Sequence, residues 1–197
     1  MRLIHILSSL SKIIEKIFLM QMSNHLIKNN LVSQSLQGGF KARSSTMAIM
    51  NIYNKLLKLK DNDKDYALVT LDQSSAYDII SLKILYNKLI HIGYHIATAQ
   101  LIIDYLTGRQ NYVEINTNKS TLIDNGDYGV NQGSVLSGFL YLCFTLDAPA
   151  VPHDNPHTSH IEDYRCPRPN LTMYVDDIYA IIVSTKDSLI NHILKYI

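Results

Sequence analysis

The run from Leu171 to Val183 constrains this chain most, because two adjacent carboxylates, Asp176 and Asp177, interrupt an otherwise apolar and β-branched sequence. The run is long enough for two short strands, with the acidic pair where a hairpin would turn. Like charges between hydrophobic strands are costly unless a cation neutralises them. Hard cations such as Mg²⁺ and Mn²⁺ prefer oxygen ligands. The run therefore predicts either a divalent-metal site or an exposed turn with two solvated aspartates.

Composition limits the class of protein. The chain has 197 residues, of which 47% are apolar and 18% charged, which is typical of one globular domain or a two-lobed unit. Its net charge of +1 gives no general attraction to phosphates, so nucleic-acid contacts would have to come from local patches. Only two cysteines are present, Cys143 and Cys166, so the sequence implies no disulfide framework and we expect a reducing compartment.

The N-terminal segment, Met1 to Met20, is apolar but is interrupted by Lys12, Glu15 and Lys16. It therefore predicts an amphipathic helix rather than a signal peptide, and no run of about 18 apolar residues predicts a membrane span. We expect an intracellular protein, in the nucleus or the cytoplasm, that is neither secreted nor membrane-bound. Both ends interrupt ordered patterns, which suggests a piece of a longer protein.

Hydrophobic periodicity predicts most of the secondary structure. Helices are expected at residues 6–30, 46–58, 81–92 and 95–106, with another ending near Leu146; strands are expected at 66–72, 112–115 and 120–123, besides the acidic hairpin. In the first helix, Glu15 is placed on the polar side. Residues 148–170 hold all five prolines and predict an irregular insertion. Its His153, His157, His160 and Cys166 have spacings that could bind zinc, although a Cys-x-x-Cys pair is missing.

A third carboxylate, Asp72, ends the strand predicted at 66–72. Together with Asp176 and Asp177 it could hold two divalent ions about 3.5–4 Å apart. Such a pair would activate a hydroxyl for attack and stabilise a leaving pyrophosphate. This is phosphoryl transfer by positioning and charge neutralisation, without a covalent nucleophile.

Five blocks in order resemble the reverse transcriptases of non-LTR retrotransposons. They are Ser9-Leu-Ser-Lys-Ile-Ile-Glu-Lys16, Gln37-Gly-Gly-Phe40 with Arg43-Ser-Ser-Thr46, Leu71-Asp-Gln-Ser-Ser-Ala-Tyr-Asp78, Gly129-Val-Asn-Gln-Gly-Ser-Val-Leu-Ser-Gly138 and Tyr174-Val-Asp-Asp177. The resemblance implies an RNA-directed DNA polymerase that uses an RNA template, a DNA primer, deoxynucleoside triphosphates and two Mg²⁺ or Mn²⁺ ions.

The implied fold is α+β: a right-hand polymerase palm with a small antiparallel sheet backed by helices, preceded by part of the fingers. Residues 1–65 would be partial fingers with the fingers–palm helices, and 66–197 the palm, and the two are expected to form one structural unit. No counterpart of the thumb is recognised, and neither is the lysine that follows the acidic hairpin in this family. We expect the missing parts in a longer polyprotein.

Residue roles follow from the matched blocks. Asp72 and Asp176 correspond to the principal metal ligands, and Asp177 to a weaker contributor. Tyr77 corresponds to the aromatic residue under the incoming sugar, where its ring would clash with a ribose 2′-hydroxyl. The alternative for Tyr77 is an ordinary core position.

The remaining correspondences concern the incoming nucleotide. Gln132 and Gly133 match residues that contact it, although Gln132 could instead cap the next helix. Arg2 resembles an arginine that meets the triphosphate. Asn131 and Gly138 replace two prolines of the family pattern, which should loosen the turn around Gln132.

The expected roles of three other residues do not concern the incoming nucleotide. Asp78 is expected to cap the helix that begins near Ser81. Lys41 and Arg43 either touch template phosphates or lie on a solvated loop.

Two functional alternatives stay open. One is a non-catalytic remnant that folds or binds RNA only, and the other is a viral-type RNA-dependent RNA polymerase. A viral-type enzyme would not be expected to carry an aromatic gate such as Tyr77.

Overall fold

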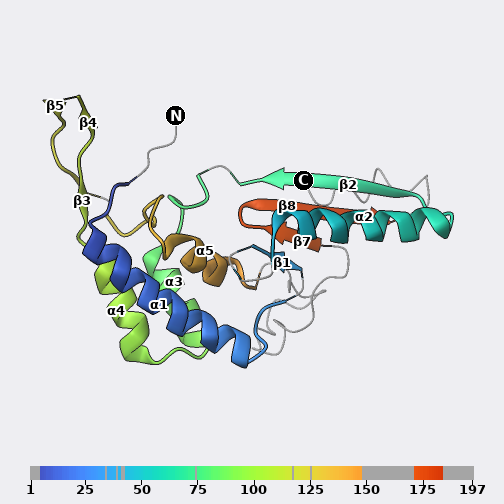
Figure 1. The fold of residues 1–197 in the computed structure, drawn as a ribbon, viewed down its shortest axis with the longest axis horizontal. Coiled ribbons are helices and arrows are strands. Elements are labelled where there is room, and N and C mark those ends of the chain that lie inside the picture. Colours follow the sequence, from blue (N-terminus) through green and yellow to red (C-terminus); the bar gives the residue numbers. More distant parts are fainter. Residues whose placement is uncertain are drawn as a thin grey trace. The chain divides into compact units, whose positions relative to one another are not determined.

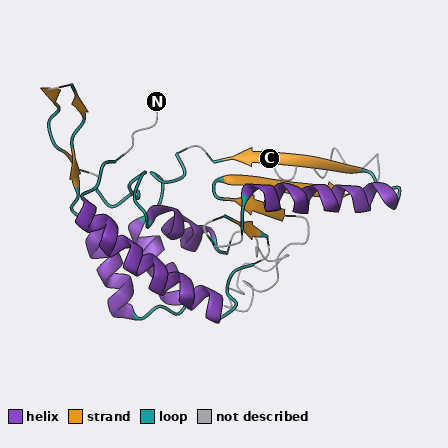
Figure 2. Cartoon of the chain, in the orientation of Figure 1, coloured by secondary structure: helices purple, strands orange, loops and turns teal. Residues whose placement is uncertain are grey.

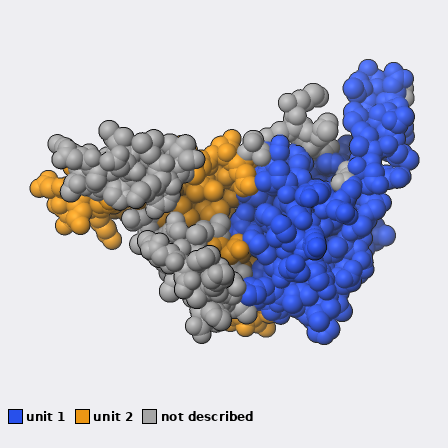
Figure 3. Space-filling view, turned by 180° about the vertical axis from the view of Figure 1, so that it is seen from behind, with its two compact units in different colours: residues 1–21, 75–145 blue, residues 22–74, 146–197 orange. Residues whose placement is uncertain are grey.

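The computed structural model describes residues 5–33, 35–38, 40, 43–73, 75–116, 118–124, 126–147 and 171–183. Helices and small sheets are both present, so the predicted α+β class is confirmed (Figure 2). The chain divides into two compact units (Figure 3). The first comprises residues 1–21 and 75–145, and the second residues 22–74 and 146–197. The assignment of residues 1–65 to fingers and 66–197 to palm stays a prediction.

The helix α1, Ser9–Lys28, forms where the periodicity predicted it, but its inward face differs from the prediction. Met22 and Leu26 are buried as expected, whereas Ile13 and Ile17 are about half exposed, at 56% and 48%. Glu15 is fully buried, so its placement on the polar side was wrong. Residues 15, 22 and 26 follow helical spacing, and the buried carboxylate therefore takes an inward position on the same face as these apolar side chains.

The first unit also contains α3 (Leu82–His91), α4 (Ile96–Leu106) and α5 (Ser137–Thr145), all close to their predicted positions (Figure 1). The Ser81 hydroxyl accepts a hydrogen bond from the Ile84 amide and is the N-cap of α3. The prediction that Asp78 caps this helix was therefore wrong. Gly93 ends the helical segment with a φ of 97°, a backbone shape that suits glycine.

The core of the first unit contains a buried pair, Cys143 of α5 and Tyr94. Burial raises the pKa of the Cys143 thiol and also that of the Tyr94 phenol, because charged forms lose their hydration. The folded state therefore favours the neutral forms of both groups.

Stability should consequently fall at alkaline pH. Below about pH 8.5, where an unfolded thiol is neutral, the contribution is fully present, and it is lost as pH rises because only the unfolded chain ionises. We expect the urea midpoint to drop between about pH 8.5 and 9.5, and to drop less steeply in Cys143→Ala. Identical slopes for the two proteins would refute this assignment.

The hairpin predicted at 112–123 forms, but as two short ladders. β3 (Gln110–Asn111) pairs with β6 (Ile123–Asp124), and β4 (Glu114–Ile115) with β5 (Asn118–Lys119). Most of the expected strand at 120–123 is not paired as strand, because the Ser120 hydroxyl accepts from the Val113 amide in place of a ladder partner.

The second unit is built on a four-stranded sheet with the order β1-β7-β8-β2 (Figure 1). These strands are β1 (Leu36–Gln37), β2 (Tyr66–Asp72), β7 (Leu171–Tyr174) and β8 (Asp177–Val183). The β7–β8 and β8–β2 pairs are antiparallel as predicted, but the edge strand β1 runs parallel to β7, which the sequence did not predict.

The helix α2, Ser45–Asp61, packs on one face of this sheet. Ser44 is its N-cap and accepts a hydrogen bond from the Met47 amide at 3.2 Å. On the sheet side, Ala48 and Ile52 are buried, and the Lys55 ammonium approaches the Thr172 hydroxyl of β7 at 3.5 Å.

None of the helices in the described part of the chain is both long and apolar enough to cross a membrane.

Candidate active site

The acidic hairpin turns in two residues. Tyr174 of β7 pairs with Asp177 of β8, which leaves Val175 and Asp176 as the loop. Val175 has a φ of 55°, a conformation that is rare for a β-branched residue and costs on the order of 1–3 kcal/mol. Two-residue hairpin loops with positive φ at the first position usually have glycine there. The loop thus holds strain directly before the first aspartate.

Asp72 and Asp177 lie directly opposite each other. They are partners in the β2–β8 register, at the last residue of β2 and the first of β8. Paired residues of antiparallel strands point to the same face, so both carboxylates lie on one side of the sheet. Like charges in this arrangement repel, and they destabilise the strand pair.

No ion pair in the described part of the chain offsets this charge. No lysine, arginine or histidine described there forms an ion pair with Asp72, Asp176 or Asp177. The oxygen donors suit Mg²⁺ or Mn²⁺ chemically. However, among the described residues no three Asp, Glu, His or Cys side chains converge as a metal-binding group, so Asp176 does not complete a triad with the opposed pair.

Gln37 and Gly38 lie against this turn. Gln37 pairs with Tyr174, and the Met173 amide donates to the Ser35 carbonyl at 2.8 Å. Gly38 has a φ of 100°, and a Cβ built there would lie 3.2 Å from Val175 Cγ2 and 3.3 Å from the Tyr174 ring. Glycine is therefore required here both by backbone shape and by the close approach of the turn.

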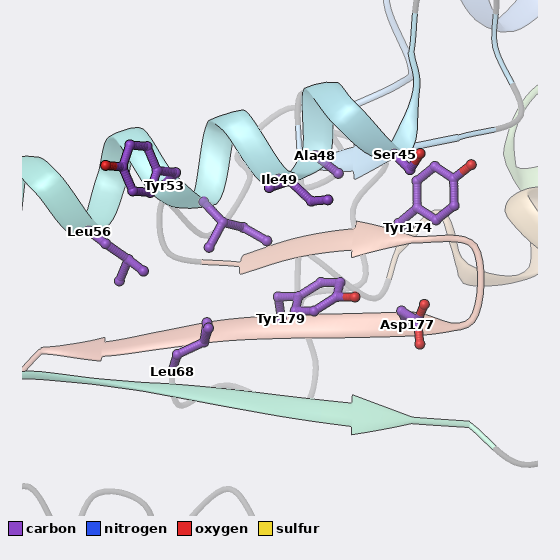
Figure 4. Close-up of a pocket in the computed structure, with 10 residues that line it drawn as sticks. Ser45, Ala48, Ile49, Tyr53, Leu56, Leu68, Tyr174, Asp177 and Tyr179 are labelled. Carbon is purple, nitrogen blue, oxygen red and sulfur yellow. The ribbon is translucent and has the colours of Figure 1, made fainter.

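A pocket of about 390 Å³ lies on the Asp177 face, between α2 and the sheet (Figure 4). Its walls are mostly apolar side chains of α2, including Ile49, Ile52 and Leu56. Tyr174 and Tyr179 line it next to Asp177, and in Figure 4 the Tyr179 hydroxyl points along β8 toward that carboxylate. A planar or aliphatic group could lie against these rings within reach of Asp177.

The first unit holds the predicted nucleotide-side residues, beginning with Tyr77. Its ring centroid lies 5.5 Å from that of Tyr141. The backbone after Tyr77 is hydrogen-bonded to residues 129–138, which we call the glycine-rich segment. Val130 N–H donates to the Tyr77 carbonyl at 2.9 Å, and Gly129 N–H donates to the Ile80 carbonyl at 2.8 Å. Gly129 has a φ of 87°, and a Cβ there would lie 3.4 Å from the Asp78 backbone. The matched block that ends at Asp78 and the one that begins at Gly129 are therefore in contact.

Gln132 and Gly133 are the central residues of a tight turn. The Ser134 amide donates to the Asn131 carbonyl at 3.1 Å, and Gly133 has a φ of 97°. Positive φ at the third residue of a four-residue turn is typical of type II, in which glycine is favoured. The Gln132 carbonyl accepts from the His5 amide at 2.8 Å.

Sequence reasoning missed one functional candidate, Glu15. Its carboxylate accepts hydrogen bonds from Tyr105, Ser134 and Val135. The available signal was a single acidic residue within an apolar helical run.

Arg43 is not on a solvated loop. Its guanidinium donates to the carbonyls of Ser33 (2.6 Å), Leu36 and Val32 (3.4 Å), and so fixes the segment that leads into β1. Both Nη atoms donate within the protein, which does not support a role in binding template phosphate.

Several predicted residues lie outside the described part of the chain. They are Arg2, Lys41 and the four potential zinc ligands His153, His157, His160 and Cys166.

An α+β fold, with two opposed aspartates beside a two-residue hairpin turn, agrees with the class of protein that the sequence blocks suggested. Residues 1–196 match the family described as reverse transcriptase (RNA-dependent DNA polymerase), and the chain belongs to this family. It is 29% identical over 181 residues to a probable RNA-directed DNA polymerase from transposon BS of Drosophila melanogaster. That alignment covers 90% of this chain but only 18% of the relative's length.

Proposed function

We propose that this chain supplies the polymerase centre of a retrotransposon reverse transcriptase, which adds deoxynucleotides to a DNA primer on an RNA template. The observation that carries the proposal is the direct opposition of Asp72 and Asp177 beside the Asp176 turn. Family membership supports it, and so does the name of the transposon relative. That name favours RNA-directed DNA synthesis over a viral-type RNA polymerase.

Asp72, Asp176 and Asp177 are proposed to hold divalent cations. When bound, Mg²⁺ or Mn²⁺ lowers the pKa of the attacking hydroxyl and neutralises charge on the triphosphate. The protein's own contribution is to place Asp72 opposite Asp177 by β-pairing and to hold Asp176 in the strained turn directly before Asp177. Repulsion between the opposed Asp72 and Asp177 carboxylates would favour cation uptake.

Tyr77, Gln132 and Gly133 are proposed to receive the deoxynucleotide. The packing of Tyr77 against Tyr141 and the backbone bonds to Val130 would hold its ring in place as a sugar gate. The Gln132–Gly133 turn presents both backbone and side-chain groups. Arg2 keeps its predicted role toward the triphosphate, and the proposed assignment of residues 1–65 to fingers and 66–197 to palm is unchanged.

The function is tested by primer extension on an RNA template with Mg²⁺ or Mn²⁺. We expect templated incorporation of deoxynucleotides and much weaker incorporation of ribonucleotides. No extension with either ion, even after fusion to the thumb region of a related polymerase, would favour a non-catalytic remnant. A preference for ribonucleotides would instead favour an RNA polymerase.

Replacing Tyr77 by valine should relax sugar selection. The smaller side chain removes the clash with the 2′-hydroxyl, so relative kcat/KM for ribonucleotides over deoxynucleotides should rise by about 10-fold or more. Tyr141→Phe is the control, because it keeps the neighbouring ring. An unchanged ratio in Tyr77→Val would show that Tyr77 is an ordinary core residue.

A further inference from the structure

Glu15 forms a buried junction between α1, α4 and the glycine-rich segment. Its side chain is 0% exposed. Oε1 accepts from the Tyr105 hydroxyl at 2.6 Å and from the Ser134 hydroxyl at 2.8 Å, while Oε2 accepts from the Val135 amide at 2.8 Å. These three hydrogen bonds offset the free-energy cost of burying a carboxylate.

Two of these donors belong to the segment that forms the Gln132 turn. Ser134 is the fourth residue of the turn, and Val135 follows it directly. The Ser134 hydroxyl, which donates to Glu15, also accepts from the Leu136 amide at 3.2 Å and so connects the carboxylate to the start of α5. The C-terminal side of the turn is therefore fixed to Glu15.

The N-terminal flank of α1 holds the centre of the same turn. The His5 amide donates to the Gln132 carbonyl at 2.8 Å, four residues before α1 begins. One helix and its flanking residue thus contact both Gln132 and the residues that follow Gly133. Shifts of α1 would be transmitted to the turn through these bonds.

On the other side, α4 orients the carboxylate. The Arg109 guanidinium lies over the Tyr105 ring, 3.9 Å from its centroid, and Arg109 Nε donates to the Tyr105 carbonyl at 2.7 Å. Burial raises the pKa of the Tyr105 phenol most, and the hydrogen bond to Glu15 raises it further. The phenol therefore remains a donor at neutral pH. The carboxylate is therefore held from two directions.

From this geometry we propose that Glu15 is a positioning residue that sets the Gln132–Gly133 turn for the incoming deoxynucleotide. The inference rests on the proposed polymerase function. Glu15 acts through the turn and contacts no reacting atom. Its contribution should appear in recognition of the nucleotide rather than in affinity for template and primer.

Glu15→Gln tests the carboxylate with minimal change in shape. Glutamine keeps one acceptor oxygen but places an NH₂ group, itself a donor, against one of the three donors. We expect KM for deoxynucleotide to rise by about 10-fold or more. The kcat per active site should change by less than about 3-fold, with unchanged Kd for template–primer. Hydrogen exchange at the Val135 amide should become faster.

Ser134→Ala is a second variant, which removes one donor and leaves the carboxylate paired with Tyr105 and Val135; it should raise the same KM by about 3-fold. Gln100→Met is the matched control on the exposed side of α4, where the Gln100 amide donates to Asp104 within the helix. It should leave KM for deoxynucleotide unchanged.

The outcomes separate the two proposals. Extension by the wild type with an unchanged deoxynucleotide KM in Glu15→Gln and Ser134→Ala overturns the positioning role and leaves the polymerase function standing. A fall in the fraction of active protein with no change in KM would also overturn the positioning role, because a purely structural residue would give that result. If the wild type neither extends primers nor binds deoxynucleotides, the proposed function fails first, and this inference fails with it.

Discussion

Replacing Asp72 by asparagine should reduce the rate of nucleotide addition on the order of 10³-fold or more, because a neutral amide oxygen binds the proposed cations much more weakly than a carboxylate does. The side chain keeps its size, and its strand remains paired with β8. Single-turnover extension of a DNA primer on an RNA template measures this loss. A reduction smaller than about 10-fold would remove Asp72 from the catalytic group.

The same substitution should leave the protein as stable as the wild type or more stable. Removing one of two carboxylates that are directly opposed relieves repulsion worth about 0.2–1 kcal/mol. The urea midpoint of Asp72→Asn should therefore rise slightly, whereas the control Asp65→Asn, just before β2, should not change it. A clear loss of stability would mean that Asp72 has a structural role and that the lost activity reflects misfolding.

Replacing Gly38 by alanine should destabilise the protein by about 1–3 kcal/mol and also reduce activity. The new methyl group would meet Val175 and Tyr174 at 3.2–3.4 Å, and the φ of 100° disfavours any side chain. Because the neighbours form the acidic turn, relief of the clash should displace Asp176. Urea unfolding and primer extension measure the two effects.

Two comparisons isolate the contact from the backbone effect. Gly108→Ala also places a side chain at positive φ, 67°, but nothing lies within 4 Å of its Cβ. It should cost less stability and leave activity unchanged. Adding Val175→Gly to Gly38→Ala should recover part of the lost stability, because it removes the nearest contact and the strained valine. Additive effects of the two substitutions would show that the Gly38–Val175 contact carries no energy.

Local signals predicted the elements of this fold well. The strand 66–72 and the acidic hairpin came from β-branched runs, and the helix around 82–91 came from apolar spacing that ends at Gly93, although its cap was assigned to Asp78 and not to Ser81. These features depend on near neighbours in sequence. The opposition of Asp72 and Asp177, by contrast, depends on strand register, which a sequence pattern does not specify across 105 residues.

Glu15 illustrates why long-range polar contacts were missed. Helical periodicity assigns a glutamate to the solvent face, and only its partners at residues 105, 134 and 135 make burial favourable. The parallel edge strand β1 was missed for a similar reason, since two residues carry no strand signal of their own. The potential zinc ligands of residues 148–170 lie outside the described residues, and their role stays a prediction.

Single-nucleotide addition to a DNA primer on an RNA template, compared between the wild type and Asp176→Asn, tests most directly whether this chain is a polymerase that depends on the hairpin carboxylates. With Mg²⁺ or Mn²⁺ the wild type should add the complementary deoxynucleotide, and the variant, with one carboxylate fewer at the hairpin turn, should add none above background. Equal extension by both proteins would place the reaction elsewhere, and no extension by the wild type, alone or fused to the thumb region of a related polymerase, would refute the polymerase assignment for this chain.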